Sequence, residues 1–397
     1  MASSAQTPAA RLLWIDPFFQ ATRPTTQSLF QALPFVLEKG WPLELWCLDH
    51  DPLDARVKVV KLPHARVLRL LEPLWFWFMA WCRLSWLRLC GQSWAVVHTS
   101  GPDMAGADVM SLHFHNRTWL RLQWWEQADS FKDRLRILHT LIGVVQETFA
   151  FKSGRWRVIL PVSEGLANRI RPQLAVGKRI HVLPNALDES RFHSGVRERH
   201  RESMRKEMQA QSQDYVFIFV STGHYHRKGL MPALLTVQAC RDMAREELGL
   251  NLRFWVVGAG ERAQSALIPQ LEQTIADWRE WVQLVPPTQA VERYYAAADA
   301  FLFPSRYETF SLVALEAAAC GLPLLVTAYD GHEMYLEDGI NGFLMPWDRE
   351  GMKERVTHFL RSGRHLLRPG PSECIHASGY AECLDRVYGD VIRERIA

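Results

Sequence analysis

Two carboxylates and the start of a helix occur together in the segment 304–323. A polar loop follows an apolar run, and the pattern predicts a helix that begins near Thr309, with Gly321 placed at its C-terminal end. Glu308 lies in the loop and Glu316 lies about two turns along the helix, so both side chains are expected to face one ligand. Carboxylates repel a second anion but accept hydrogen bonds from hydroxyl groups, which sugars and ribose supply.

The first amides of this helix are candidates to bind a phosphate. Ligands of open α/β sheets bind at the carboxyl ends of the strands, where helix N-termini present free N–H groups to anions. The residues at this position are Thr309, Phe310, Ser311 and Leu312. A phosphate beside hydroxyl-binding carboxylates is the chemistry of nucleotide-sugar recognition.

A basic loop is the second candidate element. The segment 221–229 follows an apolar run and contains Gly223, Arg227 and Lys228. An Arg/Lys pair on a short, glycine-bounded loop can neutralise a diphosphate leaving group as a glycosidic bond breaks. A basic pair in a loop is more often an ordinary solvated turn, but its position after the first strand of the same domain favours the binding role.

Two series of alternating strands and helices are predicted to position these residues. In the first half, a helix is expected at 28–39 and strands at 12–15, 43–48, 95–98, 109–113, 158–162 and 180–183. In the second half, helices are expected at 230–247, 290–298 and 310–320, and strands at 215–220, 252–257, 281–285, 300–303 and 324–327. The fold class is therefore α/β, with two Rossmann-like domains that face a cleft.

The two series meet near residue 190. Residues 1–190 are expected to form an acceptor-binding domain, and residues 191–375 a domain that binds the nucleotide-sugar donor. The charged stretch 197–207 has mixed signs and little apolar character, which predicts a solvated helix or linker helix. Residues 376–397 are predicted to form a terminal helix, a candidate to pack on the N-terminal domain.

The C-terminal half resembles the retaining nucleotide-sugar glycosyltransferases of the GT-B fold, family 4 (glycosyltransferase group 1). The resemblance runs from about residue 183 to residue 346 and rests on a set of motifs. These are Leu-Pro-Asn-Ala-Leu-Asp at 183–188, Gly-Ala-Gly-Glu at 258–261, Tyr-Ala-Ala-Ala-Asp-Ala at 295–300, Pro-Ser-Arg-Tyr-Glu-Thr-Phe-Ser-Leu at 304–312 with a Glu-x7-Glu spacing, Glu333, and Asp-Gly-Ile-Asn-Gly-Phe-Leu at 338–344.

The resemblance implies a role for each candidate residue. Glu308 would bind the hydroxyls of the donor sugar, Glu316 the ribose, and Arg227 with Lys228 the diphosphate. It also implies transfer with retention of configuration, in which the leaving phosphate takes the acceptor proton and neither a cofactor nor a metal is bound.

Three positions bear on the identity of the ligand. Thr309 and Ser311 stand where the family commonly has glycine, which adds a Cβ and a hydroxyl near the donor and leaves the donor sugar open. Gly258 begins a Gly-x-Gly pair that follows a later strand and lacks the third glycine of a dinucleotide fingerprint. This context favours a tight turn beside the nucleotide over NAD binding.

The first domain offers histidines at predicted strand ends. His113 follows a strand and resembles the family's histidine element that lines the cleft, so it is the candidate to contact the donor sugar or a phosphate and to position the acceptor. His98 and His115 are weaker candidates. A structural, hydrogen-bonded histidine is the alternative interpretation at each position.

Composition narrows the function classes. The chain has 397 residues, is 48% hydrophobic and carries a net charge of +3, which excludes a disordered chain and disfavours a nucleic-acid binder. Seven scattered cysteines, without a zinc motif, and a start without a signal-peptide pattern indicate a cytoplasmic protein with reduced thiols.

Twelve of the 16 tryptophans lie in the first 156 residues. The first 190 residues carry a charge of +6, so the aromatic half is also the basic half.

The aromatic run at 74–82 is the most apolar stretch. Its nine residues are far fewer than the ~20 that a membrane-spanning helix needs. The flanking residues Arg66, Arg69, Arg83 and Arg88 give it the composition of an interfacial anchor. Peripheral contact with the inner face of a membrane through residues 66–90 is therefore expected, and a buried helix of the first domain is the alternative.

These observations predict a retaining hexosyltransferase that moves a sugar from a nucleotide-sugar donor to a carbohydrate or lipid-linked acceptor. Its expected setting is the synthesis of glycans or cell-envelope polysaccharide. A non-catalytic nucleotide-sugar-binding subunit and a GT-B-like phosphorylase or epimerase are the alternatives.

Overall fold

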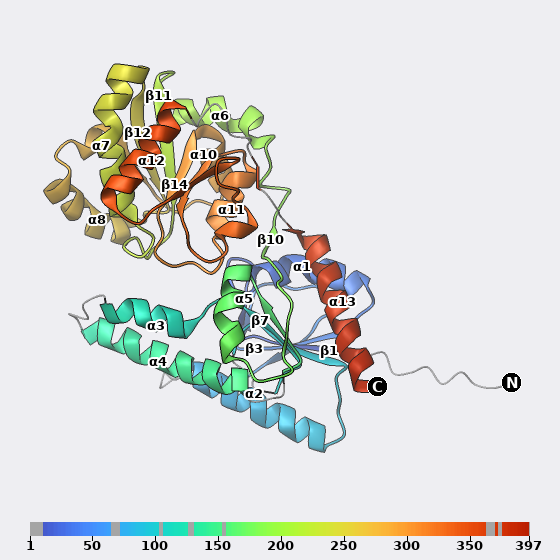
Figure 1. Cartoon of the computed structure of the whole chain (residues 1–397). Coiled ribbons are helices and arrows are strands. Elements are labelled where there is room, and N and C mark those ends of the chain that lie inside the picture. The colour runs from blue at the N-terminus through green and yellow to red at the C-terminus, as the bar shows by residue number, and fades with distance from the viewer. Residues whose placement is uncertain are drawn as a thin grey trace. The chain divides into compact units, whose positions relative to one another are not determined.

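The computed structural model describes residues 11–64, 72–102, 106–125, 131–152, 156–362, 370–371 and 375–396. The chain forms two compact units (Figure 1). The first unit contains residues 1–186 together with 375–397, and the second contains residues 187–374. Each unit is built around its own parallel sheet, which confirms the α/β class and the two Rossmann-like domains predicted from the sequence.

The first unit contains a seven-stranded parallel sheet in the order β5-β3-β1-β6-β7-β8-β9. Its strands are β1 (Leu12–Ile15), β3 (Leu43–Cys47), β5 (Lys58–Lys61), β6 (Val96–Thr99), β7 (Val109–Leu112), β8 (Val158–Pro161) and β9 (Arg179–Ile180). The five central strands are buried along their whole length, as their nearly continuous apolar sequences require. A short parallel ribbon pairs β2 (Phe18–Phe19) with β4 (Asp49–His50).

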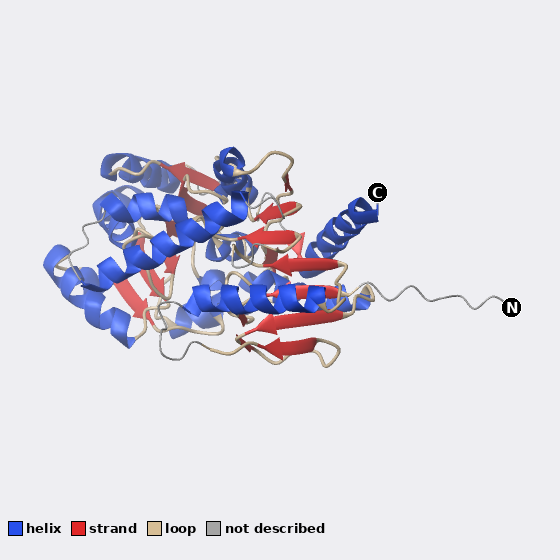
Figure 2. Ribbon diagram, turned by 90° about the horizontal axis from the view of Figure 1, so that it is seen from below, coloured by secondary structure: helices blue, strands red, loops and turns tan. Residues whose placement is uncertain are grey.

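The first unit also contains helices, which Figure 2 draws in blue. They are α1 (Gln27–Glu38), α2 (Glu72–Leu89), α3 (Asn116–Trp125), α4 (Phe131–Lys152), α5 (Glu164–Ile170) and the C-terminal α13 (Ala377–Ile396), with a short 3-10 turn at Arg171–Gln173. Neither α3 nor α4 was predicted from the sequence.

The C-terminal helix α13 belongs to the core of the first unit. Its buried residues include Tyr380, Leu384 and Tyr388, which share one hydrophobic cluster with α1 and β1. The Trp14 indole N–H donates a hydrogen bond to the Tyr388 hydroxyl at 3.0 Å. The helix therefore stabilises the first unit although it follows the second in the chain.

Helix α2 contains the aromatic run and has two different sides. Phe76, Ala80 and Leu84 are fully buried against the first unit. Trp75 and Trp81 on its outer side remain 38% and 44% exposed. The stretch is thus a core helix on one face and an apolar surface on the other. Within the described residues, no helix is both long and apolar enough to cross a membrane.

The second unit contains a six-stranded parallel sheet in the order β13-β12-β11-β14-β15-β16. Its strands are β11 (Asp214–Val220), β12 (Asn251–Val257), β13 (Val282–Val285), β14 (Ala300–Phe303), β15 (Leu324–Thr327) and β16 (Gly342–Met345). Its helices are α6 (Val196–Glu207), α7 (Leu230–Leu248), α8 (Glu261–Thr274), α9 (Trp278–Trp281), α10 (Val291–Ala297), α11 (Leu312–Ala319) and α12 (Arg349–Arg361), with a 3-10 turn at His332–Met334. The two remaining strands, β10 (Ala186–Leu187) and β17 (Ile375–His376), pair with each other.

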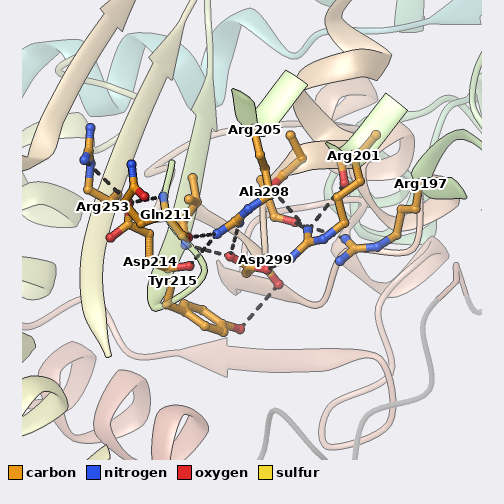
Figure 3. Close-up of polar contacts among 12 residues, drawn as sticks. Arg197, Arg201, Arg205, Gln211, Asp214, Tyr215, Arg253, Ala298 and Asp299 are labelled. Atoms are coloured by element: carbon orange, nitrogen blue, oxygen red, sulfur yellow. Dashed lines mark hydrogen bonds and ion pairs between the residues drawn. The ribbon is translucent and has the colours of Figure 1, made fainter. Parts of the chain in front are cut away.

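The charges of α6 predicted a solvated helix or linker helix, and the structure shows that only one side of it is solvated. Arg197, Arg201 and Arg205 are spaced four residues apart, so they lie on one face of the helix and point at the end of α10 (Figure 3). Their guanidinium groups donate hydrogen bonds to the carbonyls of residues 296–298. Arg205 also pairs with Asp299, and both side chains are nearly buried, at 13% and 12% exposed. The arginines thus satisfy the free carbonyls that every helix end leaves.

Candidate functional site

The candidate site of the second unit lies at one edge of its sheet. Because all six strands are parallel, the loops after β11, β12, β14 and β15 leave from the same edge. These loops carry most of the residues singled out from the sequence: the basic loop at 221–229, the turn at 258–260, and the acidic loop at 304–311. The topology of the sheet therefore brings together segments that are separated by about 80 residues in the chain.

The basic loop and the acidic loop are joined through Arg227 and Glu308. The Arg227 guanidinium Nη2 lies 3.8 Å from Glu308 Oε1, and both side chains are largely shielded, at 16% and 14% exposed. The Ser305 hydroxyl is 3.3 Å from the same carboxylate oxygen. The backbone N–H of Arg306 donates to the Arg227 carbonyl at 2.9 Å, which fixes one loop against the other. The charged pair is therefore held in place before any ligand binds.

Lys228 contributes a cation in a shielded position. Its Nζ lies 5.5 Å from the centroid of the Phe303 ring. Burial lowers the pKa of the Lys228 ammonium, while the neighbouring Glu308 carboxylate raises it and Arg227 lowers it further. Two cations beside one carboxylate leave a local excess of positive charge, which an anionic ligand such as a diphosphate would offset.

Three glycines allow the loops to approach one another closely. Gly229, Gly258 and Gly331 all have positive φ angles, of 78°, 103° and 94°. A Cβ at Gly229 would lie against the Pro304 carbonyl, and one at Gly331 would lie 2.6 Å from the Thr309 carbonyl oxygen. Gly229 and Gly331 are therefore required both because the backbone has a positive φ angle and because there is no room for a Cβ. Gly258 closes β12 in a tight turn, the interpretation favoured by its sequence context.

Tyr225 adds a further link between these loops. Its hydroxyl lies 3.0 Å from the carbonyl oxygens of both Ser221 and Gly258. Gly223, the other glycine singled out in the basic loop, donates its N–H to the Ser221 hydroxyl at 3.2 Å. The basic loop is therefore built on hydrogen bonds at its base, while its Arg–Lys end contacts the acidic loop.

Helix α11 starts three residues later than the sequence predicted, at Leu312. Thr309, Phe310 and Ser311 precede it and are buried, at 7%, 8% and 3% exposed. The Ser311 side chain makes no capping hydrogen bond, and its backbone N–H donates to the Tyr335 hydroxyl. Among the four residues expected to bind phosphate, Ser311 therefore already uses its amide within the protein.

Glu316 lies on α11, in a pocket with Tyr295. The Tyr295 hydroxyl donates to the Val313 carbonyl at 3.1 Å and lies 3.4 Å from Glu316 Oε2. Burial raises the pKa of the Glu316 carboxyl to about 8, although the nearby Arg191 guanidinium acts in the opposite direction. With this pKa the carboxyl is mostly protonated at neutral pH, so it must lose its proton before both of its oxygens can accept hydrogen bonds from a ligand.

The second unit matches a known family. Residues 214–362 match the family Glycosyl transferases group 1. The second unit is a group 1 glycosyltransferase domain. Within this domain, the match includes the basic loop, the acidic loop and the complete helix α11.

Curated relatives align with part of the chain. The D-inositol 3-phosphate glycosyltransferase of Geodermatophilus obscurus is 32% identical over 209 residues, which are 51% of this chain and 44% of the relative. The enzyme of the same name from Actinosynnema mirum is 30% identical over 241 residues, 55% of this chain and 54% of the relative. The chain thus spans about half the length of the curated relatives it matches.

Solved structures match over nearly the whole chain. WaaG, described as a glycosyltransferase involved in lipopolysaccharide biosynthesis, has a TM-score of 0.68 at 18% identity, with 96% of this chain and 95% of WaaG covered. Anabaena HepE in complex with UDP-glucose has a TM-score of 0.60 at 13% identity, with 98% and 99% covered. At these identities the likeness shows the fold, which is the GT-B fold expected from the sequence.

The three candidate histidines lie in the first unit, outside the group 1 domain. His98 is buried, and its ring nitrogens lie 2.6 Å from the Tyr388 hydroxyl and 2.9 Å from the Ser111 hydroxyl. His115 Nδ1 lies 2.7 Å from the Thr118 hydroxyl. Both rings therefore take part in internal hydrogen bonds, as the structural alternative predicts.

His113 differs from the other two because it lines a cavity. The cavity has a volume of about 410 Å³ and lies where β1, β6 and β7 end. It is lined by polar side chains that include Asp16, Arg23, Glu72 and Gln146, and by the aromatic rings of Phe18 and Phe114. Burial lowers the pKa of the His113 imidazole to about 4, although the nearby Asn185 side chain acts in the opposite direction. The ring is therefore neutral at physiological pH and can exchange hydrogen bonds with a polar ligand.

Sequence reasoning missed the other polar residues of both sites. In the first unit, Arg23 and Gln146 come from a loop and a helix that carry no recognisable motif, so only the fold brings them together. In the group 1 domain, Tyr225 and Tyr295 were present in quoted motifs, but nothing in their spacing indicated that their hydroxyls contact the loops and Glu316.

Proposed function

We propose that the protein transfers a hexosyl group from a nucleotide-sugar to a hydroxyl group of a carbohydrate or lipid-linked acceptor, with retention of configuration. The observation that carries the proposal is the cluster of Arg227, Lys228 and Glu308 at the sheet edge of a group 1 glycosyltransferase domain, with Glu316 on the helix that follows. Of the relatives in fold, HepE binds UDP-glucose, which supports a nucleotide-sugar as donor.

Each residue of the cluster has a separate task in this reaction. Arg227 and Lys228 offset the negative charge that develops on the diphosphate as the bond from the anomeric carbon to the phosphate oxygen breaks. Glu308 accepts hydrogen bonds from the sugar hydroxyls, and Glu316 accepts them from the ribose. The acceptor oxygen forms the new bond on the same face of the sugar, and the leaving phosphate takes the acceptor proton. No step requires a metal or a cofactor.

The cavity of the first unit is proposed to bind the acceptor. Its mixture of carboxylates, an arginine, an amide and aromatic rings suits a sugar, which presents hydroxyl edges and apolar faces. His113 would donate or accept one of these hydrogen bonds and so position the acceptor. A cavity for another substrate, in addition to the donor-binding residues of the second unit, favours transfer over simple nucleotide-sugar binding and over phosphorolysis or epimerisation.

We also propose a cellular setting for the protein. It acts in the cytoplasm and contacts the inner face of a membrane peripherally through residues 66–90. There it takes part in the synthesis of glycans or cell-envelope polysaccharide. The exposed aromatic side chains of α2 support the membrane contact.

The test is turnover of UDP-, GDP- and ADP-sugars by the purified protein. One donor should be hydrolysed slowly without acceptor and transferred when a glycan or membrane extract is added. Lys228→Ala and Glu308→Gln should each lower the rate by about 10²-fold or more, as expected for a lost electrostatic contact in a transition state. Arg306→Ala changes an exposed cation of the same loop and should leave the rate unaffected.

Other outcomes would reassign the protein. Binding of a donor without turnover would indicate a non-catalytic subunit. Release of free nucleotide and an altered free sugar would indicate an epimerase, and dependence on inorganic phosphate a phosphorylase. A product of inverted anomeric configuration would contradict retention.

A further inference from the structure

The outer sides of α2 and α4 carry most of the exposed large apolar side chains in the described chain. These nine residues, called here the apolar face, are Trp75, Phe78, Trp81, Trp86 and Leu89 on α2, and Leu138, Leu141, Val145 and Phe149 on α4. Elsewhere in the described residues, only Val176, Ile340 and Trp347 are large, apolar and comparably exposed. Soluble surfaces scatter such side chains singly, whereas a cluster marks a surface that contacts an apolar partner.

The two helices meet through an aromatic contact. The rings of Trp77 on α2 and Phe149 on α4 pack edge to face, with their centroids 6.1 Å apart, and within α2 the Trp75 ring lies 6.3 Å from the Phe78 ring. The inner stripe of α2 is fully buried, and α4 buries Ala150 and Phe151 near its C-terminal end. Both helices are thus anchored in the fold, so the exposure of the outer residues is a property of the folded unit and does not arise from fraying.

The charges on these helices favour an anionic partner. Among their described side chains, the exposed charged residues are Arg83, Arg88 and Lys152. Glu147 is buried, and Glu72 is partly buried with its carboxylate 2.9 Å from a ring nitrogen of His64. Aromatic residues flanked by arginine and lysine suit a membrane interface with negatively charged lipids, and among the described side chains of α2 and α4 no carboxylate is classed as exposed. A second copy of this surface would bring like charges together.

A basic pocket lies at one end of the apolar face. It has a volume of about 380 Å³ and is lined by Arg117, Thr148, Lys152 and Gln173 among others, with no acidic residue. Thr148 is adjacent in sequence to Phe149 of the apolar face. A lipid phosphate group could therefore occupy the pocket while the acyl chains contact the neighbouring rings.

Helix α4 also forms part of the cavity that contains His113. His139, Ile142, Gly143 and Gln146 line that cavity, on the side of the helix that adjoins the apolar face. Helix α2 likewise starts at the cavity, which Glu72 and Pro73 line. The same pair of helices thus carries the apolar face and part of the cavity wall.

We propose that the apolar face docks on an anionic lipid bilayer and thereby brings the adjoining cavity to acceptors that are anchored in that bilayer. This inference extends the contact expected at 66–90 to α4 and selects a lipid-linked acceptor over a free carbohydrate. The choice of acceptor rests on the proposed function, but the docking itself does not.

Docking is tested by vesicle flotation of the full-length protein. The vesicles contain phosphatidylcholine alone or with roughly one third phosphatidylglycerol, which supplies the negative charge. The protein should float with the anionic vesicles and less so at high salt. A variant with Phe78, Trp81, Val145 and Phe149 replaced by serine should bind about tenfold more weakly or worse, whereas Ile340→Ser, an exposed apolar residue of the second unit, should bind like the parent. Thermal unfolding confirms that each variant is folded.

Three results would overturn docking: no flotation, equal flotation of the fourfold variant and the parent, or self-association in sedimentation that the variant abolishes while neither protein floats. The last result would assign the apolar face to a second copy of the chain.

The acceptor class is tested with radiolabelled nucleotide-sugar and a membrane extract. Label should enter the fraction soluble in organic solvent, and the fourfold variant should lose this transfer while it hydrolyses donor at the parental rate. Label found only in water-soluble products, at equal rates for both proteins, would overturn the lipid-linked acceptor. Absence of any donor turnover would contradict the proposed function instead, and the flotation result would be unaffected.

Discussion

The protonation state of Glu316 makes the proposed ribose contact testable by pH. Burial raises the pKa of this carboxyl from 4.5 to about 8. The difference corresponds to a penalty of about 5 kcal/mol on the ionised form in the empty protein, at about 1.4 kcal/mol per pH unit. At pH 7 about nine tenths of the molecules therefore carry a protonated Glu316. Hydroxyls of the ribose donate to the carboxylate, so nucleotide binding should release a proton.

The expected size of the effect follows from linkage. Below pH 8 the affinity for a nucleotide-sugar should rise by up to about tenfold per pH unit, because the carboxyl must first lose its proton. Between pH 6 and pH 9 the total gain should approach about a hundredfold. Glu316→Gln cannot ionise, so its affinity should show no such slope.

The free energy of unfolding is a second, independent readout of the Glu316 protonation state. Its dependence on pH is opposite to that of the nucleotide-sugar affinity. In the unfolded chain the carboxyl ionises near its ordinary pKa of 4.5, whereas in the folded, empty protein it stays protonated up to about pH 8. The free energy of unfolding should therefore fall as the pH rises between these values and then level off. Glu316→Gln should lack this contribution.

The assay is calorimetric titration with a nucleotide-sugar in buffers of different ionisation enthalpy, which counts the protons released. His226→Gln serves as a control for the histidines of the basic loop. The reasoning is refuted if binding to the parent is independent of pH between 6 and 9, or if Glu316→Gln shows the same slope and the same proton release as the parent.

Two further predictions concern the packing of the second unit. Gly331→Ala should lower both the nucleotide affinity and the stability, because the added Cβ would lie 2.6 Å from the Thr309 carbonyl oxygen and the positive φ disfavours alanine. Gly339→Ala is the matched control, since Gly339 also has a positive φ but has open space around it. Thermal unfolding and nucleotide-binding assays compare the two variants. Arg205→Met should destabilise the unit by about 3–5 kcal/mol, because Asp299 loses a shielded ion-pair partner, and denaturant unfolding measures it. An effect below about 1 kcal/mol would show that Arg201 alone satisfies Asp299.

The sequence predicted the second unit in detail because its strands are short, buried apolar runs with glycines and prolines at their ends. Strands β11, β12, β14 and β15 lie within one residue of their expected bounds. The Arg227–Lys228 loop and Glu308 were therefore placed on the same sheet edge from the sequence alone. Their contact at 3.8 Å could not be predicted, because it depends on how closely Gly229 lets the two loops approach.

The prediction of a solvated helix or linker helix missed the partnered face of α6, because charge composition does not show which charges have partners. Its arginines alternate with glutamates, which is typical of a solvated helix, but the spacing of Arg197, Arg201 and Arg205 places them on one face. The partner, the end of α10 near Asp299, is about 95 residues away in sequence. A pattern confined to one helix cannot identify such a partner.

The first unit was predicted less completely. The sequence indicated its central strands, but it assigned neither α3 nor α4, and it left α2 either in the core or at a membrane. The structure shows why the pattern was ambiguous: α2 buries Phe76 and Ala80 and exposes Trp75 and Trp81, so it is apolar on both sides. A helix of this kind has no polar face from which its orientation could be deduced.

The central claim is that the group 1 domain binds a nucleotide-sugar through its basic loop. Its most direct test is calorimetric titration of the purified protein and of Lys228→Ala with UDP-, GDP- and ADP-sugars at constant pH. The account predicts that the parent binds at least one of them and that Lys228→Ala, still folded, binds it at least about tenfold more weakly. Failure of the parent to bind any nucleotide-sugar, or equal affinities for the two proteins, would contradict it.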